Sequence, residues 1–122
     1  MKVIRSKDGT ELDVQINRMD DVQLLALTNY PDLSFDWSLE VGNEVYQLSM
    51  LLRPAHPLGL MTVSTRKNML VVYIDQIEAT KPNRRREKLY IGVAGCLIAF
   101  ACYLSFERGF NGSVVLEPKI IW

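Results

Sequence analysis

The sequence predicts an α+β fold, in which a mixed, mostly antiparallel sheet contains one central βαβ crossover. Short runs of alternating or β-branched residues recur along the chain, and such runs are typical of strands. One long apolar stretch, residues 92–108, is typical of a buried helix. A basic loop and this helix separate the last two strand-like runs, which is the order of a βαβ unit.

Turn and helix-end residues separate the predicted elements along the chain. Two short strands, residues 2–5 and 11–16, flank Asp8-Gly9 and form a hairpin. A helix begins at Asp20-Asp21 and ends before Pro31, and residues 32–44 are irregular. Strands follow at residues 44–52, 58–64, 69–79 and 112–119, the first two separated by a proline-bounded turn that contains His56.

Length and composition limit the classes of protein. The chain has 122 residues, which suits a single domain over residues 1–122. Hydrophobic residues make up 48% and charged residues 23%, which disfavours a disordered chain. Lys+Arg and Asp+Glu both number 14, so the net charge is zero and we expect no nucleic-acid partner.

The charges are distributed unevenly. Residues 1–44 contain nine acids and four bases (4 − 9 = −5), and residues 45–122 contain ten bases and five acids (10 − 5 = +5). The two parts could simply attract each other, or the basic part could hold an anion. The second interpretation is favoured by a cluster of five bases within eight residues: Lys81, Arg84, Arg85, Arg86 and Lys88.

Cysteine and histidine are scarce. Cys96 and Cys102 lie six residues apart, which places them on different faces of a helix, so they do not pair with each other. With His56 as the sole histidine, the sequence predicts no zinc site. The first residues contain no apolar signal-peptide core, and reduced thiols are typical of the cytosol, so we expect a cytoplasmic protein.

The uncharged stretch Leu89–Phe106 allows two interpretations. Its 18 residues would form a helix of about 27 Å, just short of a bilayer core. A helix buried on a sheet has the same composition. We favour the buried helix because the other segments predict strands that need a cover, and we expect no membrane partner.

The start of this helix is a candidate anion site. Unpaired N–H groups and the helix dipole attract anions there, and glycines let a phosphate approach the main chain. The GxGxxG pattern is not satisfied, because Ala94 stands at its second glycine and Leu97 at its third. Two plainer interpretations stay open: Gly95 and Ala99 allow close packing on the sheet, and Arg84–Arg86 are solvated.

The strand at residues 69–79 is another candidate. Its apolar run breaks down across Asp75-Gln76-Ile77-Glu78. A bulge or a splayed strand end would expose backbone groups to a ligand at this point, and a plain strand end is the alternative.

Together these segments resemble the GNAT superfamily of acyl-CoA N-acyltransferases. The similar stretch is YIDQIEATKPNRRREKLYIGVAGCLIAFACYLSFERGFNGSVVLEPK, within residues 69–119. Gly92-Val93-Ala94 matches the G-x-G/A end of that superfamily's acyl-CoA motif. Leu89 replaces the preceding Gln or Arg, and Arg86 and Lys88 lie close enough to supply the charge.

The resemblance implies a site for acetyl-CoA as cosubstrate, or for a related acyl-CoA. The backbone at Ile77 and Ala79 would bind the pantetheine arm. The pyrophosphate would lie against residues at the helix start: Gly92, Val93, Ala94, Gly95 and Cys96. Glu78 would be the general base that deprotonates an unidentified amine acceptor, with Asp75 as a second candidate. An exposed carboxylate at a strand end is the alternative for Glu78.

The resemblance also implies elements that this sequence does not contain. GNAT proteins continue beyond the last strand with a helix and two strands, which often carry a tyrosine general acid. Relative to that pattern the chain is expected to be C-terminally truncated, with strand 112–119 as a bare edge. A bare edge favours pairing with a second copy, so we expect a homodimer through it. A non-catalytic binding or self-association module is the alternative function.

Overall fold

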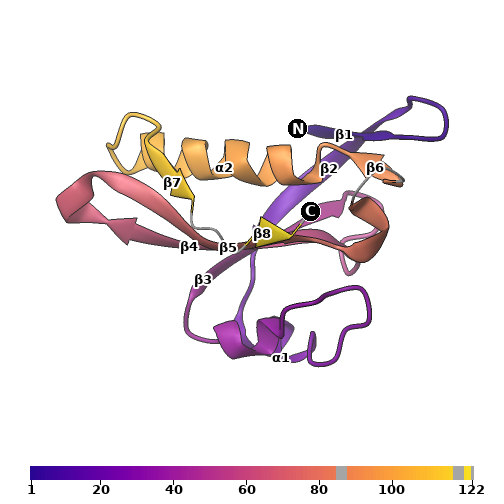
Figure 1. Ribbon diagram of the computed structural model, residues 1–122, viewed down its shortest axis with the longest axis horizontal. Helices are drawn as coiled ribbons and strands as arrows, with labels where there is room; N and C mark the ends of the chain where they lie inside the picture. The colour runs from indigo at the N-terminus through magenta and orange to yellow at the C-terminus, as the bar shows by residue number, and fades with distance from the viewer. Residues whose placement is uncertain (85–87, 117–119, 122) are drawn as a thin grey trace.

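The computed structural model describes residues 1–84, 88–116 and 120–121, and it shows one twisted sheet with a helix across it (Figure 1). The helices are α1 (Asp21–Leu25) and α2 (Val93–Glu107). Three short 3-10 turns are η1 (Trp37–Glu40), η2 (Lys67–Met69) and η3 (Lys81–Asn83). The strands are β1 (Lys2–Arg5), β2 (Glu11–Arg18), β3 (Glu44–Met50), β4 (Pro57–Arg66), β5 (Val71–Ala79), β6 (Tyr90–Ile91), β7 (Val114–Leu116) and β8 (Ile120–Ile121).

The strands lie in the order β6-β1-β2-β3-β4-β5-β7, and β8 also pairs with β5. Each neighbouring pair from β6 to β5 is antiparallel. β7 and β8 run parallel to β5. The connection from β5 through α2 to β7 is therefore the predicted βαβ crossover. The α+β class and the mostly antiparallel sheet are confirmed.

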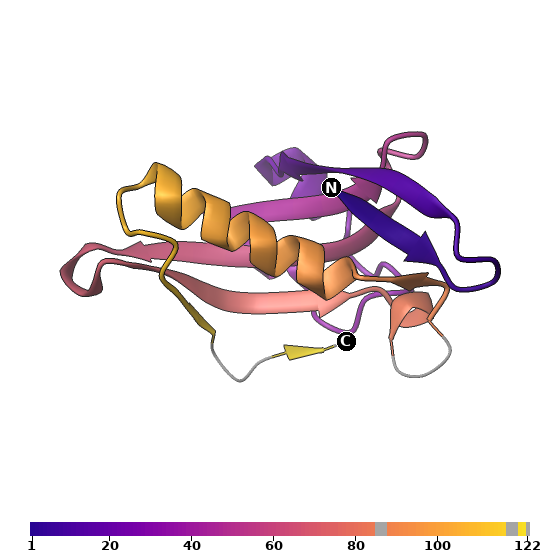
Figure 2. The ribbon, with the colours of Figure 1, turned by 90° about the horizontal axis from the view of Figure 1, so that it is seen from above.

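Each face of the sheet has its own cover (Figures 1 and 2). α2 lies across one face, and its side chains Val93, Leu97 and Ala101 belong to the main hydrophobic core. On the other face, the segment from α1 to η1 encloses a second core around Trp37 and Leu24, both of which are fully buried. Residues 32–44, predicted as irregular, thus include the 3-10 turn η1 that places Trp37 beneath the sheet.

The close packing of α2 depends on a glycine of the sheet. A Cβ at Gly59 of β4 would lie 2.8 Å from Val93 Cγ1 and 3.0 Å from Leu97 Cδ1. By contrast, a Cβ at Gly95 would meet nothing within 4 Å, and both Gly95 and Ala99 are exposed. The prediction that Gly95 and Ala99 allow close approach to the sheet is wrong, because they lie on the outer side of α2.

The strand prediction is accurate in place and less so in extent. The predicted hairpin is confirmed as β1 and β2. The described part of the predicted strand 112–119 contains β7 over Val114–Leu116, and residues 117–119 of that prediction lie outside the described residues. β4 is buried along most of its length, whereas β5 alternates with half-buried positions. β4 is the more buried strand because it lies between β3 and β5 with a cover on both faces. The two-residue strands β6 and β8 were not predicted.

The short helix α1 begins as its sequence predicts. Asp20 caps it by accepting a hydrogen bond from Gln23 N (2.8 Å), and the Gln23 side chain accepts one from Asp20 N (2.9 Å). This reciprocal pair is a capping box. As for the apolar stretch, α2 spans 15 residues, and no helix in the described part of the chain has the length and apolar character needed to cross a membrane.

Candidate functional site

The start of α2 presents unpaired backbone donors. Gly92 is the N-cap and has φ of +99°, a left-handed conformation that glycine adopts without strain. It turns the chain from β6 into the helix. Within the described residues, the N–H groups of Val93, Ala94 and Gly95 have no hydrogen-bond acceptor. The N–H of Cys96 already donates to Gly92 O at 2.9 Å.

These donors line a small cavity of about 120 Å³ between the helix start and the end of β5. Its walls are Ala79, Asn83, Lys88, Tyr90, Gly92, Val93, Ala94 and Gly95. The cavity therefore brings together six of the residues predicted to bind the cofactor: Ala79, Lys88, Gly92, Val93, Ala94 and Gly95. Cys96 is not part of its wall. Arg86, the other predicted cation, lies outside the described residues.

Asn83 fixes the shape of this cavity. Its side chain is almost fully buried, donates to Thr80 Oγ1 at 2.9 Å and accepts from Tyr90 N at 3.1 Å. Thr80 N in turn donates to Leu58 O at 2.9 Å on β4. These hydrogen bonds connect the loop after β5 to the sheet and to β6, so they fix the position of the loop beside the start of α2. Asn83 was not singled out as a site residue, because nothing in the sequence showed its bond to Tyr90.

Cys96 does not match the role that the resemblance implies. Its amide is used inside the helix, and its Sγ lies 3.3 Å from Lys2 O. Burial raises the pKa of the Cys96 thiol. Both donors of Cys96 therefore already have acceptors, and its role in holding a pyrophosphate stays a prediction. Both cysteines are unpaired, as the spacing predicts.

β5 contains a bulge where its apolar run breaks down. Thr62 of β4 faces Gln76 and Val63 faces Ile74, which leaves Asp75 as the extra residue. On the opposite edge, β7 pairs with β5 as far as Ile74. Among the described residues, the next pairs on that edge are those of Ile77 and Glu78 with β8. The bulge interpretation is confirmed, and the outer edge of β5 is shared between two strands.

Glu78 is fully buried on the face of the sheet opposite α2. Its carboxylate accepts hydrogen bonds from Ser34 N (2.5 Å), Phe35 N (3.1 Å) and Trp37 Nε1 (2.8 Å). It also forms an ion pair with Arg84. The alternative interpretation of an exposed strand-end carboxylate is wrong. The role of Glu78 as general base stays a prediction. Its carboxylate already accepts hydrogen bonds from four donors.

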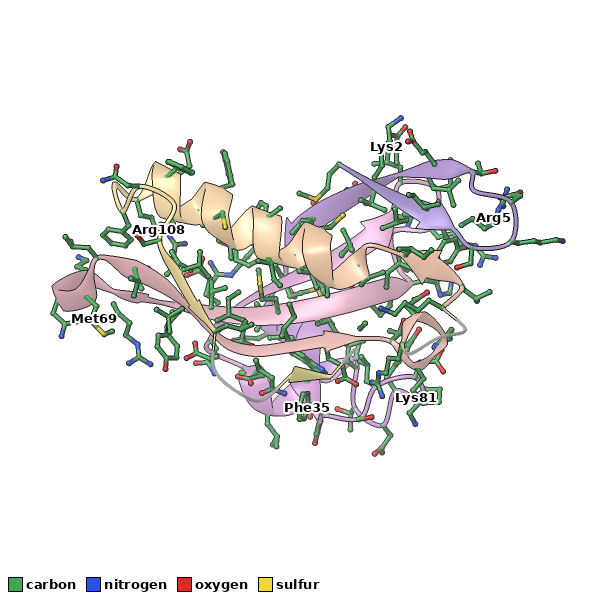
Figure 3. All side chains as sticks on the ribbon, turned by 45° about the horizontal axis from the view of Figure 1, so that its top comes forward. Lys2, Arg5, Phe35, Met69, Lys81 and Arg108 are labelled. Carbon is green, nitrogen blue, oxygen red and sulfur yellow. The ribbon has the colours of Figure 1, made fainter. Side chains whose placement is uncertain are left out.

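Arg84 is part of this cluster rather than a solvated loop residue. Its Nε donates to Ala79 O at 2.7 Å, and its Nη1 donates to Ser34 Oγ at 2.9 Å. Figure 3 shows Phe35 and Lys81 on the same side of the sheet, away from α2. The solvated interpretation of Arg84 is therefore wrong. The sequence could not show this, because Ser34 lies fifty residues earlier.

Two further predicted residues have surface positions. Asp75, the second candidate base, lies 3.6 Å from the Arg66 guanidinium with about a third of its side chain exposed. His56 is exposed in the turn before β4, and its N–H donates to Arg53 O at 3.1 Å. In the described residues, no three His, Cys, Asp or Glu side chains gather closely enough to hold a metal ion.

Comparison with known proteins shows a distant similarity. An Escherichia coli (strain K12) protein, described as the uncharacterized HTH-type transcriptional regulator YdcI, is 24% identical over 112 residues. The match covers 92% of this chain and 33% of that protein, so the chain spans about a third of its length. No protein-family profile matches the chain, and no solved structure matches it.

Proposed function

We propose that this chain is a GNAT-like domain that binds acyl-CoA, with acetyl-CoA as the first ligand to test. One observation carries the proposal. At the start of α2, three N–H groups that have no acceptor among the described residues line a small cavity beside the end of a bulged strand. Such donors, with the helix dipole, stabilise a phosphate oxygen.

The cavity fits a part of the cofactor rather than all of it. Its volume of about 120 Å³ is well below the roughly 300–1,000 Å³ of pockets that enclose a whole ligand. A pyrophosphate group would enter it, while the adenosine would lie on the surface. The half-buried Lys88, which is part of the cavity wall, raises the local positive potential around that opening.

A charge placed at Gly95 tests the proposal. Gly95 is exposed, and a Cβ added at this position would have no neighbouring atom within 4 Å, so a side chain fits without a clash. A glutamate in the first helical turn also interacts favourably with the helix dipole, so Gly95→Glu should fold. We expect Gly95→Glu to weaken acetyl-CoA binding at least ten-fold in calorimetry, because the carboxylate repels the pyrophosphate.

Gly95→Gln is the matched control, since it has the same size without the charge. It should bind acetyl-CoA within about three-fold of the wild type. An equal loss in both variants would show that bulk rather than charge matters, and the phosphate site would then lie elsewhere. No binding by the wild type at millimolar acetyl-CoA would exclude the proposed function.

A non-catalytic role is the second candidate, and the position of Glu78 favours it. A general base must reach the proton it removes, and this carboxylate is buried and already accepts four donors. We therefore expect no CoA release from acetyl-CoA with a panel of amines. Release above the uncatalysed rate that is lost in Glu78→Gln, with folding and acetyl-CoA binding retained, would restore the acyltransferase hypothesis.

The distant relative adds little to either candidate. Its description names an HTH-type regulator, and a helix-turn-helix needs two helices joined by a short turn. In the described part of this chain, α1 and α2 are separated by most of the sheet. We propose no DNA contact for this chain.

A further inference from the structure

We infer that β8 is an internal competitor of acyl-CoA: it occupies the stretch of the β5 edge that the pantetheine arm would take. This inference rests on the function proposed above. It concerns the backbone of Ile120 and Ile121, which pairs with Ile77 and Glu78.

The edge of β5 is divided at the bulge. β7 pairs with Val72, Tyr73 and Ile74, and β8 pairs with Ile77 and Glu78. The bulged Asp75 separates the two stretches. A bulge increases the local twist of the strand, and here it lies between these two stretches of β5. The second stretch is therefore a separate docking position for an extended chain.

This second stretch leads directly to the cavity. Ile121 is paired with Glu78, and the next residue of β5, Ala79, is part of the cavity wall with Gly92–Gly95. A ligand with its pyrophosphate at the helix start and its arm along β5 would meet the backbone of β8. In Figures 1 and 2, β8 lies beside the end of β5 that is close to the start of α2.

The pantetheine arm and β8 have similar hydrogen-bonding capacity. A pantetheine arm carries two secondary amides, and β8 is a strand of two residues. Each amide supplies one donor and one acceptor, as a peptide unit does. Backbone hydrogen bonds give a net stabilisation of modest size, so the pairing of Ile120 and Ile121 with β5 is exchangeable. A ligand that brings the same amides and also a pyrophosphate can displace it.

Competition lowers the apparent affinity by the fraction of molecules in which the edge is open. Removing β8 should therefore tighten acyl-CoA binding without altering the phosphate site. We expect a chain that lacks residues 120–122 to bind acetyl-CoA about ten-fold more tightly than the full chain in calorimetry. Ile120→Pro/Ile121→Pro should do the same, because proline removes the backbone N–H donors of β8.

Ile120→Val/Ile121→Val is the matched control. It keeps the backbone donors and the strand propensity, so its affinity should equal that of the full chain. Hydrogen exchange of the apo proteins gives an independent measurement. The amides in residues 77–79 should exchange faster in the deletion and proline variants than in the valine control.

The outcomes separate this inference from the proposed function. Tighter binding in the deletion and proline variants supports the inference. Equal affinity in all four proteins overturns it, and acyl-CoA binding stands. If none of the four binds acetyl-CoA, the proposed function fails, and the inference fails with it.

Discussion

Glu78 and Arg84 form a charged pair that the fold removes from water. The Glu78 side chain is fully buried, and 12% of the Arg84 side chain is exposed. A buried charge is tolerated when its hydrogen-bonding capacity is met, and here the donors of residues 34–37 meet it. The pair thereby holds the loop before η1 against the end of β5.

Removing the arginine should be costly. Arg84→Met leaves the Glu78 carboxylate buried with no cation, and such a change typically costs about 3–5 kcal/mol. We expect the free energy of unfolding, measured with urea, to fall by about 3 kcal/mol. Lys81→Met is the control, because it removes the same charge from an exposed side chain of the same loop. It should change the free energy of unfolding by less than about 0.5 kcal/mol, and similar losses in both variants would contradict the account of the pair.

Glu44 gives a pH-dependent prediction at the same scale. Burial alone would raise the pKa of Glu44, but hydrogen bonds from Arg108 and Tyr46 outweigh it and hold the pKa below its ordinary 4.5. The folded protein therefore holds fewer protons at this site than the unfolded chain. The resulting stability is present above pH 4.5 and is lost as the pH falls through the folded-state pKa.

We expect Glu44→Gln to lower the free energy of unfolding by about 1 kcal/mol at pH 7, since the pair is partly exposed. The difference from the wild type should shrink as the pH is lowered below 4.5. Urea unfolding at a series of pH values measures it. A difference that stays constant from pH 7 to pH 3 would show that the charge on Glu44 contributes nothing.

At the scale of elements, α2 packs closely on β4 because Gly59 of β4 has no side chain. A methyl group at Gly59 would contact Val93, Leu97 and the backbone oxygen of Glu78, at 2.8 to 3.0 Å. Each of these neighbours belongs to the packed interior. The position of the helix start, and hence of the candidate phosphate site, depends on this contact.

Gly59→Ala should therefore lower the free energy of unfolding by about 1–3 kcal/mol, the range typical of an overpacked core. Gly95→Ala is its matched partner on the outer side of the same helix. It should raise the free energy of unfolding by about 0.5–1 kcal/mol, because alanine favours the helix and meets no neighbour. Thermal or urea unfolding compares them, and equal effects in the two variants would contradict the packing described here.

The sequence predicted the elements better than their contacts, and the two glycines of α2 and β4 show why. Hydrophobic periodicity and the turn and capping residues located α2, the crossover and the break in β5, because these are local sequence patterns. Gly95 and Gly59 are indistinguishable by local pattern, and only the packing of α2 on β4 assigns the close approach to Gly59. The same holds for Glu78, three of whose donors lie more than forty residues earlier, and for β8, which is too short to have a period.

For the molecule as a whole, the uneven charge distribution has a partial structural explanation. Arg108 at the end of α2 pairs with Glu44 at the start of β3, so the basic and acidic parts of the chain do attract each other. Figure 3 shows Arg108 at the far end of α2 from Lys81. The two interpretations of the charges are thus compatible, since this pair and the candidate anion site lie at opposite ends of the helix.

β7 is the last strand of the sheet in the described order, so its outer edge is available for pairing. The homodimer predicted through this edge is tested by light scattering, where we expect the mass of two chains. Leu116→Lys, at a position that is 39% exposed, should shift the protein towards monomer, since charges on an edge oppose pairing. Leu52→Lys is the control, because Leu52 is 94% exposed at a distant turn. A wild-type monomer at high concentration would overturn this prediction.

The indole of Trp37 has a spectroscopic consequence. It is fully buried and donates to the Glu78 carboxylate, so its fluorescence should be sensitive to any opening of the loop that covers this pair. The chain has two tryptophans, and a protein shortened to residue 119 retains Trp37 alone. The variant designed to free the β5 edge is thus also a single-tryptophan protein, whose emission reports on the opposite face of the sheet while a ligand is titrated.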